Sequence, residues 1–408
     1  MKRCIERAAA LFAALLLLSA GLAPAETRLM VVSDIHYLAR PLYKGSELFL
    51  RALRAGDGKL AQCGDELMDA LHREAVRLMP DALVLTGDLS FNGEKASHEA
   101  LADRLARIEA AGVSVWVIPG NHDINSPMPI GYGGDSWYAV EGVDEAGFSD
   151  IYAGFLLPAT EGANLSYLAP VSDELWLAMT DVAFYQGQAQ TFGLFTAGHA
   201  RWLEDAMERA KVAGATLITA THHSLLPHTE FSRDSFLMFG HETMEALARE
   251  HGLRLNLSGH LHAQHIARAE GLADAALGAF CLWPHRYALV TLRDDGSLTY
   301  EAKSLGEDVL PEGFPEMSRQ WFEGIAVDKT LAALSELDLS EEEREAMADY
   351  AARFNLAYFS GTYRSDDAAW REDPAYALWR DGPDSLMWQY MDLVMNEPTG
   401  DNLNYFAG

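Results

Sequence analysis

Aspartate, asparagine and histidine side chains follow five apolar stretches of the chain, each at the point where the stretch ends. Carboxylate oxygens, imidazole nitrogens and an amide oxygen are the ligands that Mn, Fe and Zn ions take in proteins. A metal centre is therefore the chemistry that these residue types predict. The polar groups that form this set are Asp34 and His36, Asp88, Asn121 to Asp123, His222 and His223, and His260 and His262.

The elements that must position these side chains are strands. Residues 29–33, 82–86, 113–118, 215–221 and 253–258 are short and apolar, which is typical of buried strands. Helical spacing of apolar residues between them indicates alternation of strands and helices. Because an open parallel sheet binds ligands at the carboxyl ends of its strands, we expect the polar groups to meet at one sheet edge.

The spacing within the groups indicates two cations rather than one. His260 and His262 are two positions apart, so at the usual strand rise their side chains fall on one side about 7 Å apart. That separation allows each to reach a different metal. Asp88 has two carboxylate oxygens and could bridge them, and two cations about 4 Å apart stabilise in-line displacement at phosphorus.

The order of these motifs resembles the signature of calcineurin-like metallophosphoesterases. The series runs from Asp34-Ile35-His36 through Gly87-Asp88, Gly120-Asn121-His122-Asp123 and His222 to Gly259-His260-Leu261-His262, and the resemblance covers about residues 27–305. Residues 87–98 and 283–287 look like the secreted bacterial branch similar to class III cyclic-nucleotide phosphodiesterases. This resemblance implies an α/β fold, a four-layer α/β/β/α sandwich with an α-helical C-terminal domain.

Carried over to this chain, the resemblance implies how each metal would be held. Asp34, His36, Asp88 and His262 would hold the first metal, and Asp88, Asn121, His222 and His260 the second. A hydroxide bridging the metals would attack phosphorus in line. His122 would protonate the leaving oxygen or stabilise charge at phosphorus, and Asp123 could orient it through its other ring nitrogen.

The residues leave alternatives for the choice between His222 and His223, for the substrate contacts and for the identity of the metals. His222 and His223 cannot both point to the metals from a strand end, because successive side chains alternate; the first is the family's ligand. Asn92, Asn125 and His223 are candidate substrate contacts, although asparagine is also common in turns. Leu89 follows Asp88 where a tyrosine ligand would favour iron, so the two ions could be Mn²⁺, Fe²⁺/Fe³⁺ or Zn²⁺.

Three segments are predicted along the chain. Residues 1–25 have a basic start, an apolar run and the small-residue motif that ends at Ala25, which predicts a signal peptide cleaved after Ala25. We therefore expect a secreted or periplasmic protein with no membrane anchor after cleavage. Residues 26–306 form the metallophosphoesterase domain and 307–408 the helical domain, in which 317–405 is expected to be wholly helical. Residues 37–58 and 125–147 are expected to be loops over the site.

Charge and cysteines limit the partners. The chain has 408 residues and a formal net charge of −29, which disfavours nucleic acid polymers and anionic membranes. A small phosphate ester is the expected substrate. Cys63 and Cys281 could form a disulfide or remain two buried thiols, and the residues do not indicate an oligomeric state.

The predicted activity is hydrolysis of phosphodiester bonds by a secreted two-metal enzyme. The resemblance favours cyclic-nucleotide or related small phosphodiesters. A sphingomyelinase-like or glycerophosphodiester phosphodiesterase and a broad phosphomonoesterase are alternatives on the same core. A non-catalytic metal-binding protein of the cell envelope is an alternative of another class.

Overall fold

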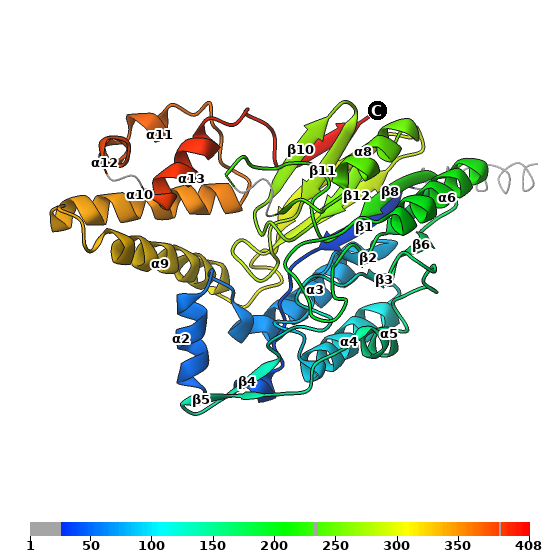
Figure 1. Ribbon diagram of the computed structural model, residues 1–408, viewed down its shortest axis with the longest axis horizontal. Helices are drawn as coiled ribbons and strands as arrows, with labels where there is room; N and C mark the ends of the chain where they lie inside the picture. The colour runs from blue at the N-terminus through cyan, green and yellow to red at the C-terminus, as the bar shows by residue number, and fades with distance from the viewer. Residues whose placement is uncertain (1–25, 232–235, 383–384) are drawn as a thin grey trace, which may run out of the picture.

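Two six-stranded sheets face each other in the middle of the molecule, and a group of helices lies to one side (Figure 1). The computed structural model describes residues 26–231, 236–382 and 385–408. The predicted signal peptide, its cleavage point at Ala25, and Cys4 lie outside these residues. No helix of the described ranges is long and apolar enough to cross a membrane.

The first sheet combines parallel and antiparallel pairs. Its order is β14-β13-β12-β1-β2-β3, with β1, β2 and β3 parallel and β12, β13 and β14 joined antiparallel. The parallel half is the one that presents strand ends to the predicted site. Its strands are β1 (Thr27–Val32), β2 (Ala82–Leu85), β3 (Ser114–Val117), β12 (Arg286–Leu292), β13 (Leu298–Ser304) and β14 (Asn404–Ala407).

The second sheet has the order β10-β11-β9-β8-β7-β6, in which the four central strands are parallel. The edge strands β10 and β6 pair antiparallel with their neighbours. The carboxyl ends of β8 and β9 therefore lie at one edge. The strands are β6 (Tyr167–Pro170), β7 (Leu175–Met179), β8 (Thr216–Ala220), β9 (Leu255–Ser258), β10 (His265–Ala269) and β11 (Leu272–Ala276).

Successive side chains of a strand point to opposite faces of its sheet, and this alternation places them in two different cores. In β1, Leu29 and Val31 pack in the core between the sheets, whereas Met30 and Val32 pack in the core beneath the covering helices. Every side chain of β1 except that of Arg28 is buried, because both faces of the sheet are covered. Helices α3 (Gly64–Leu78) and α4 (Lys95–Ala110) contribute to the core on the first sheet, and α6 (Ala197–Ala213) and α8 (His241–Glu250) to the core on the second. The predicted α/β/β/α sandwich is confirmed.

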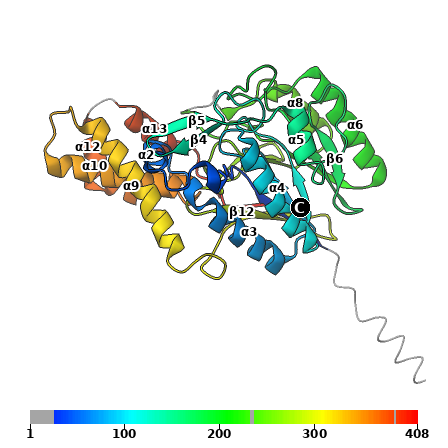
Figure 2. The same ribbon diagram turned by 90° about the horizontal axis from the view of Figure 1, so that it is seen from below.

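A helical region follows residue 306 and stands beside the sandwich (Figure 2). Its aromatic side chains form a separate core that includes Phe354 and Trp379. Ser340 begins α10 as expected, since its side-chain oxygen accepts a hydrogen bond from the Glu343 N–H. The helices are α9 (Phe314–Leu334), α10 (Glu341–Phe359), α11 (Ala369–Glu372), α12 (Pro374–Asp381) and α13 (Leu386–Met395).

The end of the chain corrects one expectation. Residues 317–405 are not wholly helical, because β14 pairs antiparallel with β13 and extends the first sheet. Tyr405 and Ala407 pack against the core between the sheets, while Phe406 is 63% exposed. Four residues of alternation are too short a pattern to distinguish from a loop in the sequence.

The two expected rim loops also contain regular structure. Residues 37–58 include α2 (Glu47–Ala55), which begins at Ser46 and buries Phe49 and Leu53. Residues 125–147 include a hairpin of β4 (Ile130–Gly133) and β5 (Ser136–Ala139) and the start of α5 (Glu145–Ile151). Phe49 and Leu53 are four positions apart, as on one face of a helix, but the proline and glycines around them suggested a loop; these are Pro41, Gly45, Gly56 and Gly58.

Cys63 and Cys281 are both free thiols, so of the two alternatives the disulfide is excluded.

Candidate metal centre

The ends of five strands deliver the predicted ligands to one place. Asp34 and His36 follow β1, and Asp88 follows β2. From the other three strands, β3 leads to Asn121, β8 to His222 and β9 to the pair His260 and His262. Contacts among these ligands join residues up to 226 positions apart in the chain, and they connect both sheets.

Most of these residues have an unusual backbone. Asp34, His36, Asp88, His260 and His262 have φ values of 54°, 44°, 48°, 63° and 61°. Residues other than glycine rarely adopt this left-handed conformation, and such strain persists only where surrounding structure enforces it. The strand ends thus curl sharply and turn each ligand toward the shared edge.

The glycines of the motifs permit close approach between these turns. A Cβ on Gly87 would lie 2.6 Å from Nδ1 of His222. A Cβ on Gly120 would overlap the Asp88 amide nitrogen and carboxylate, and one on Gly259 would overlap Ser33. Any side chain there would therefore displace a ligand or the loop that carries it.

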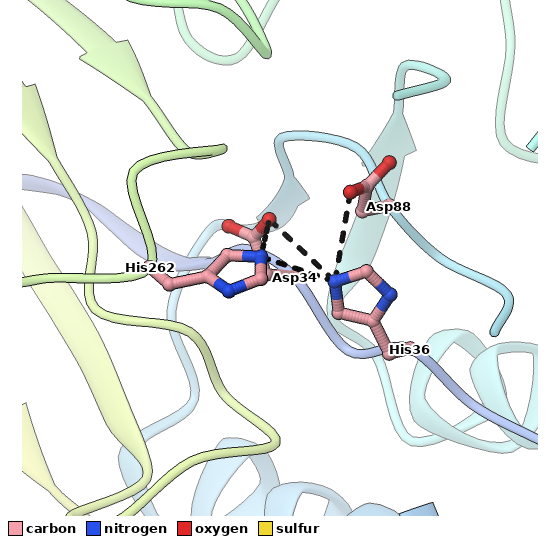
Figure 3. A group of neighbouring side chains, drawn as sticks. All are labelled: Asp34, His36, Asp88 and His262. Atoms are coloured by element: carbon pink, nitrogen blue, oxygen red, sulfur yellow. Dashed lines mark hydrogen bonds and ion pairs between the residues drawn. The ribbon is translucent and has the colours of Figure 1, made fainter. Parts of the chain in front are cut away.

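Four side chains form the first group (Figure 3). Nε2 of His36 lies 3.2 Å from Nε2 of His262 and 3.5 Å from Oδ2 of Asp88. Oδ1 of Asp34 lies 3.3 Å from the same His262 nitrogen. These are the four residues assigned to the first metal from the sequence.

The second group shares Asp88 with the first. Asp88, His222 and His260 each place a ligand atom within 4.8 Å of the others. Nε2 of His222 is 3.4 Å from Oδ1 of Asp88 and 3.2 Å from the amide oxygen of Asn121. The two oxygens of Asp88 thus face different groups, as a bridging ligand requires.

These separations fit cation binding. Two atoms each about 2.1 Å from one metal are about 3.0 Å apart at a right angle and about 3.4 Å apart in a tetrahedron. The Asp34 and Asp88 carboxylates are buried, and within the described residues their ion pairs are all with histidines. Two buried carboxylates without a Lys or Arg partner need another source of positive charge.

The electrostatics of the metal-free side chains follow from this crowding. Burial opposes ionisation of Asp34, yet the hydrogen bond from His262 brings the pKa of Asp34 below its usual value. Burial likewise opposes charge on His222, but Asp88 raises the pKa of His222 to about 9. Protons therefore occupy positions that cations would take, and metal binding would release them.

His122 lies at the edge of the first group and faces it with one nitrogen. Its Nδ1–H donates to the Phe91 carbonyl oxygen at 3.1 Å and to the Asn92 side-chain oxygen at 2.9 Å. Nε2 lies 3.9 Å from Oδ2 of Asp88. The imidazole is therefore held by its outer nitrogen and presents Nε2 to the centre.

Asp123 does not make the predicted contact with the His122 ring. Its carboxylate accepts hydrogen bonds from the backbone N–H groups of Leu89, Ser90 and Gly120, and from the Ser90 hydroxyl. Neighbouring residues in a tight turn point in different directions, so Asp123 instead ties the loop after β2 to the loop after β3. Asn92 takes the role expected of Asp123.

The other two candidate substrate contacts have partners in the protein. The Asn125 side-chain amide donates to the Tyr185 carbonyl oxygen, and its φ of 50° is that of a turn residue. Nε2 of His223 lies 3.1 Å from the Thr191 carbonyl oxygen, and its ring lies 4.4 Å from that of His260. His223 therefore packs behind His260, while His222 faces Asp88.

Two residues near the site were not indicated by the sequence. Oδ2 of Asp57 lies 3.4 Å from Nδ1 of His262, and Nζ of Lys59 lies 3.2 Å from Oδ2 of Asp57. Asp57 thus contacts the ring nitrogen of His262 that points away from the first group. Both residues lie between α2 and α3 in a segment without a motif, so only the folded chain reveals them.

Two family models match this chain. The first, described as calcineurin-like phosphoesterase, matches residues 27–264. The second, described as the C-terminal domain of cyclic nucleotide phosphodiesterase, matches residues 307–401. The first match includes the five strand ends and their ligands, and the second includes the helices that stand beside the sandwich.

Two solved structures are similar to this chain at low sequence identity. A dimetal phosphatase from Danio rerio is 14% identical with a TM-score of 0.50, and the match covers 69% of this chain and 97% of that chain. A purple acid phosphatase from yellow lupin seeds is 14% identical with a TM-score of 0.47, covering 69% of this chain and 52% of that one. Among curated protein sequences, none matches this chain.

Proposed function

The chain belongs to the calcineurin-like phosphoesterase family, and we propose that it hydrolyses cyclic nucleotides or related small phosphodiesters with two bound metal ions. The observation that carries the proposal is Asp88, whose two oxygens face two separate groups of ligands. The match of residues 307–401 to the C-terminal domain of cyclic nucleotide phosphodiesterase supports the substrate class.

The metals would supply charge stabilisation at phosphorus and a lowered pKa for water. Asp34, His36, Asp88 and His262 would hold one ion, and Asp88, Asn121, His222 and His260 the other. Their strained, glycine-flanked turns fix the ligand atoms before binding, so little reorganisation is needed when a cation enters.

His122 acts on the leaving group in this proposal. Because Phe91 and Asn92 accept from Nδ1–H, the other nitrogen remains directed at the centre. In the imidazolium form of the ring Nε2 also carries a proton, and this proton can pass to the oxygen that leaves phosphorus, which returns the ring to its neutral Nδ1–H form, or it can remain as a hydrogen bond to that oxygen. Removal of this ring would slow the reaction without removing a metal ligand.

Charge favours a small substrate. Two divalent ions exceed the two negative charges of Asp34 and Asp88, so the loaded centre is positive and attracts a phosphate ester. The whole chain is strongly acidic, with a formal net charge of −29, and repels a long polyanion beyond the site. We therefore place small diesters ahead of nucleic acid polymers.

A substrate screen tests the proposal. The purified protein, supplied with Mn²⁺, is assayed with cyclic nucleotides, glycerophosphodiesters, choline phosphodiesters, and a chromogenic diester and monoester. We expect the highest kcat/KM with cyclic nucleotides and little turnover of the monoester. Preference for choline or glycerol diesters, or for the monoester, would favour the corresponding alternative enzyme, and inactivity of the metal-loaded protein on every ester would refute the proposal.

We also propose export of the protein, on the basis of the basic and apolar residues 1–25. Expression of the full chain in a bacterial host, followed by fractionation and N-terminal sequencing, tests this. A mature chain beginning at Glu26 outside the cytoplasm supports export. An uncleaved chain confined to the cytoplasm contradicts it.

A further inference from the structure

The segment Asp57-Gly58-Lys59 lies between the metal centre and the C-terminal helices. It joins α2 to the turn before α3, and the Leu60 N–H donates to the Cys281 carbonyl oxygen at 2.9 Å. On one side Asp57 contacts His262, a ligand of the first group. On the other side Gly58 faces α9.

Contact between Gly58 and α9 is close. Gly58 has a φ of +97°, and a Cβ there would lie 2.7 Å from the ring of Phe322. Phe322 is buried and belongs to a small apolar cluster with Cys281, Leu282 and Leu356. The C-terminal region thus reaches the metal centre through this segment as well as through Leu261 and Ala263, which pack with Phe354 and Tyr358, and Phe322 of α9 packs directly on Gly58.

Lys59 places a positive charge beside the centre. Its side chain is only 14% exposed, and its ion-pair partner in the described chain is Asp57. Nζ of Lys59 lies 3.2 Å from Oδ2 of Asp57, and the same oxygen lies 3.4 Å from Nδ1 of His262. The ammonium is therefore one residue removed from a ligand of the first group.

The ammonium of Lys59 has more N–H donors than its ion pair with Asp57 uses. An ammonium has three N–H donors, and the pair with Asp57 occupies one side of it. Asp57 is also stabilised by His262, so it has a second partner without Lys59. A buried cation with free donors, next to a centre that handles phosphate esters, can donate charge-assisted hydrogen bonds to phosphate oxygens.

We propose that Lys59 binds the non-bridging phosphate oxygens of substrate and product, and that α9 holds it in position through the Gly58–Phe322 contact. This inference rests on the proposed function for the identity of the ester. It assigns the C-terminal region a role in phosphate binding. A lysine that only balances the charge of Asp57 would leave phosphate affinity unchanged when replaced.

Binding of inorganic phosphate to the Mn²⁺-loaded full chain tests the role of Lys59 without turnover. Lys59→Met and Lys59→Arg are compared by calorimetry with wild type and with Lys303→Met, an exposed lysine paired with Glu301. We expect Lys59→Met to bind phosphate about tenfold to a hundredfold more weakly, as for loss of a hydrogen bond between charged groups. Lys59→Arg should retain part of the affinity, Lys303→Met all of it, and metal content should stay at the wild-type value.

Equal phosphate affinity in wild type and Lys59→Met, with metals in place, would overturn the inference. Loss of metal from Lys59→Met would also overturn it, since the lysine would then support the ligands rather than the phosphate. These results are separable from the proposed function. Lysine-dependent phosphate binding in a protein that cleaves no diester would refute only the proposed function, and diester cleavage that is indifferent to Lys59 would refute only this inference.

The part played by α9 is tested with Phe322→Leu and Phe322→Ala. Both keep the catalytic residues and loosen the contact with Gly58, and the milder change guards against misfolding. We expect phosphate affinity to fall severalfold, more for alanine than for leucine, with little further loss when Lys59→Met is added. Full additivity of the two changes would overturn the coupling between α9 and Lys59.

Discussion

The side-chain oxygen of Asn92 lies 2.9 Å from Nδ1 of His122, and this contact holds the ring with Nε2 toward the metal centre. The contact joins the turn after β2 to the turn after β3. It accounts for the position of a histidine that binds neither predicted metal.

Replacing Asn92 should slow catalysis without removing metal. In Asn92→Ala, His122 loses one of two acceptors for Nδ1–H, so we expect kcat to fall about tenfold, as for one lost hydrogen bond, with KM little changed. Asn125→Gly is the matched control, because Asn125 contacts Tyr185 and its left-handed turn accepts glycine. A tenfold loss in Asn125→Gly but none in Asn92→Ala would contradict this assignment.

Replacing His122 should affect poor leaving groups most. With His122→Ala we expect kcat to fall about 10²- to 10⁴-fold on a diester with an alkoxide leaving group, the range of general acid catalysis. A nitrophenolate leaving group needs little protonation, so the fall in kcat on a nitrophenyl diester should be much smaller. Measurement of kcat for wild type and His122→Ala on both esters, with metal content as control, tests this difference. An equal fall in kcat on the two esters would argue against proton donation by His122.

Asp57 should strengthen binding of the first metal. In Asp57→Asn, Nδ1 of His262 loses its carboxylate partner, and we expect metal affinity at one site to fall about tenfold to a hundredfold. Titration with Mn²⁺ measures this as a split between a tight and a weakened site. Asp295→Asn, in an exposed turn, controls for loss of negative charge; unchanged binding in Asp57→Asn would exclude a supporting role.

Asp181 should make stability depend on pH. It is fully buried at the end of β7, and burial raises the pKa of Asp181 from 3.8 to about 7 although Leu165, Ala183 and Tyr185 donate to it. The folded state favours its protonated form, so its stabilising contribution is complete below about pH 4 and is lost as pH rises through 7.

The expected loss between about pH 4 and about pH 8 is about 4 kcal/mol, from the size of the shift. Denaturant unfolding of wild type and Asp181→Asn across this range measures it. The asparagine of Asp181→Asn cannot ionise, so the stability of the variant relative to wild type should increase as pH rises. A difference that stays constant with pH would show that Asp181 does not titrate in this range.

Sequence patterns predicted which candidate ligands lie together, because these residues are concentrated at strand ends. The end of each apolar stretch indicates where a strand stops and its polar residues begin. The glycines before Asp88, Asn121 and His260 lie at turns in which a Cβ would clash with neighbouring residues. The sandwich follows from the same alternation of strands and helices. These features involve residues that are close together in the chain, so they can be recognised in the sequence without knowledge of the fold.

Features that depend on distant parts of the chain were not predictable. Asp57 and Lys59 lie in a segment that is held by the Leu60–Cys281 hydrogen bond and by the contact of Gly58 with Phe322, and no spacing rule connects these residues in the sequence. Asp123 was expected to face His122 because they are adjacent, but the turn directs its carboxylate to three backbone N–H groups. β14 was missed because four alternating residues resemble a loop until β13 offers a partner.

Counting bound metal in Asp88 and Asn121 variants tests the two-metal centre most directly. We expect two equivalents of Mn²⁺ in wild type, one in Asn121→Ala, which loses a ligand of the second group only, and none held tightly in Asp88→Ala, which removes the shared carboxylate. Circular dichroism confirms that each variant is folded. An Asp88→Ala protein that retains two equivalents of metal would contradict the bridged centre.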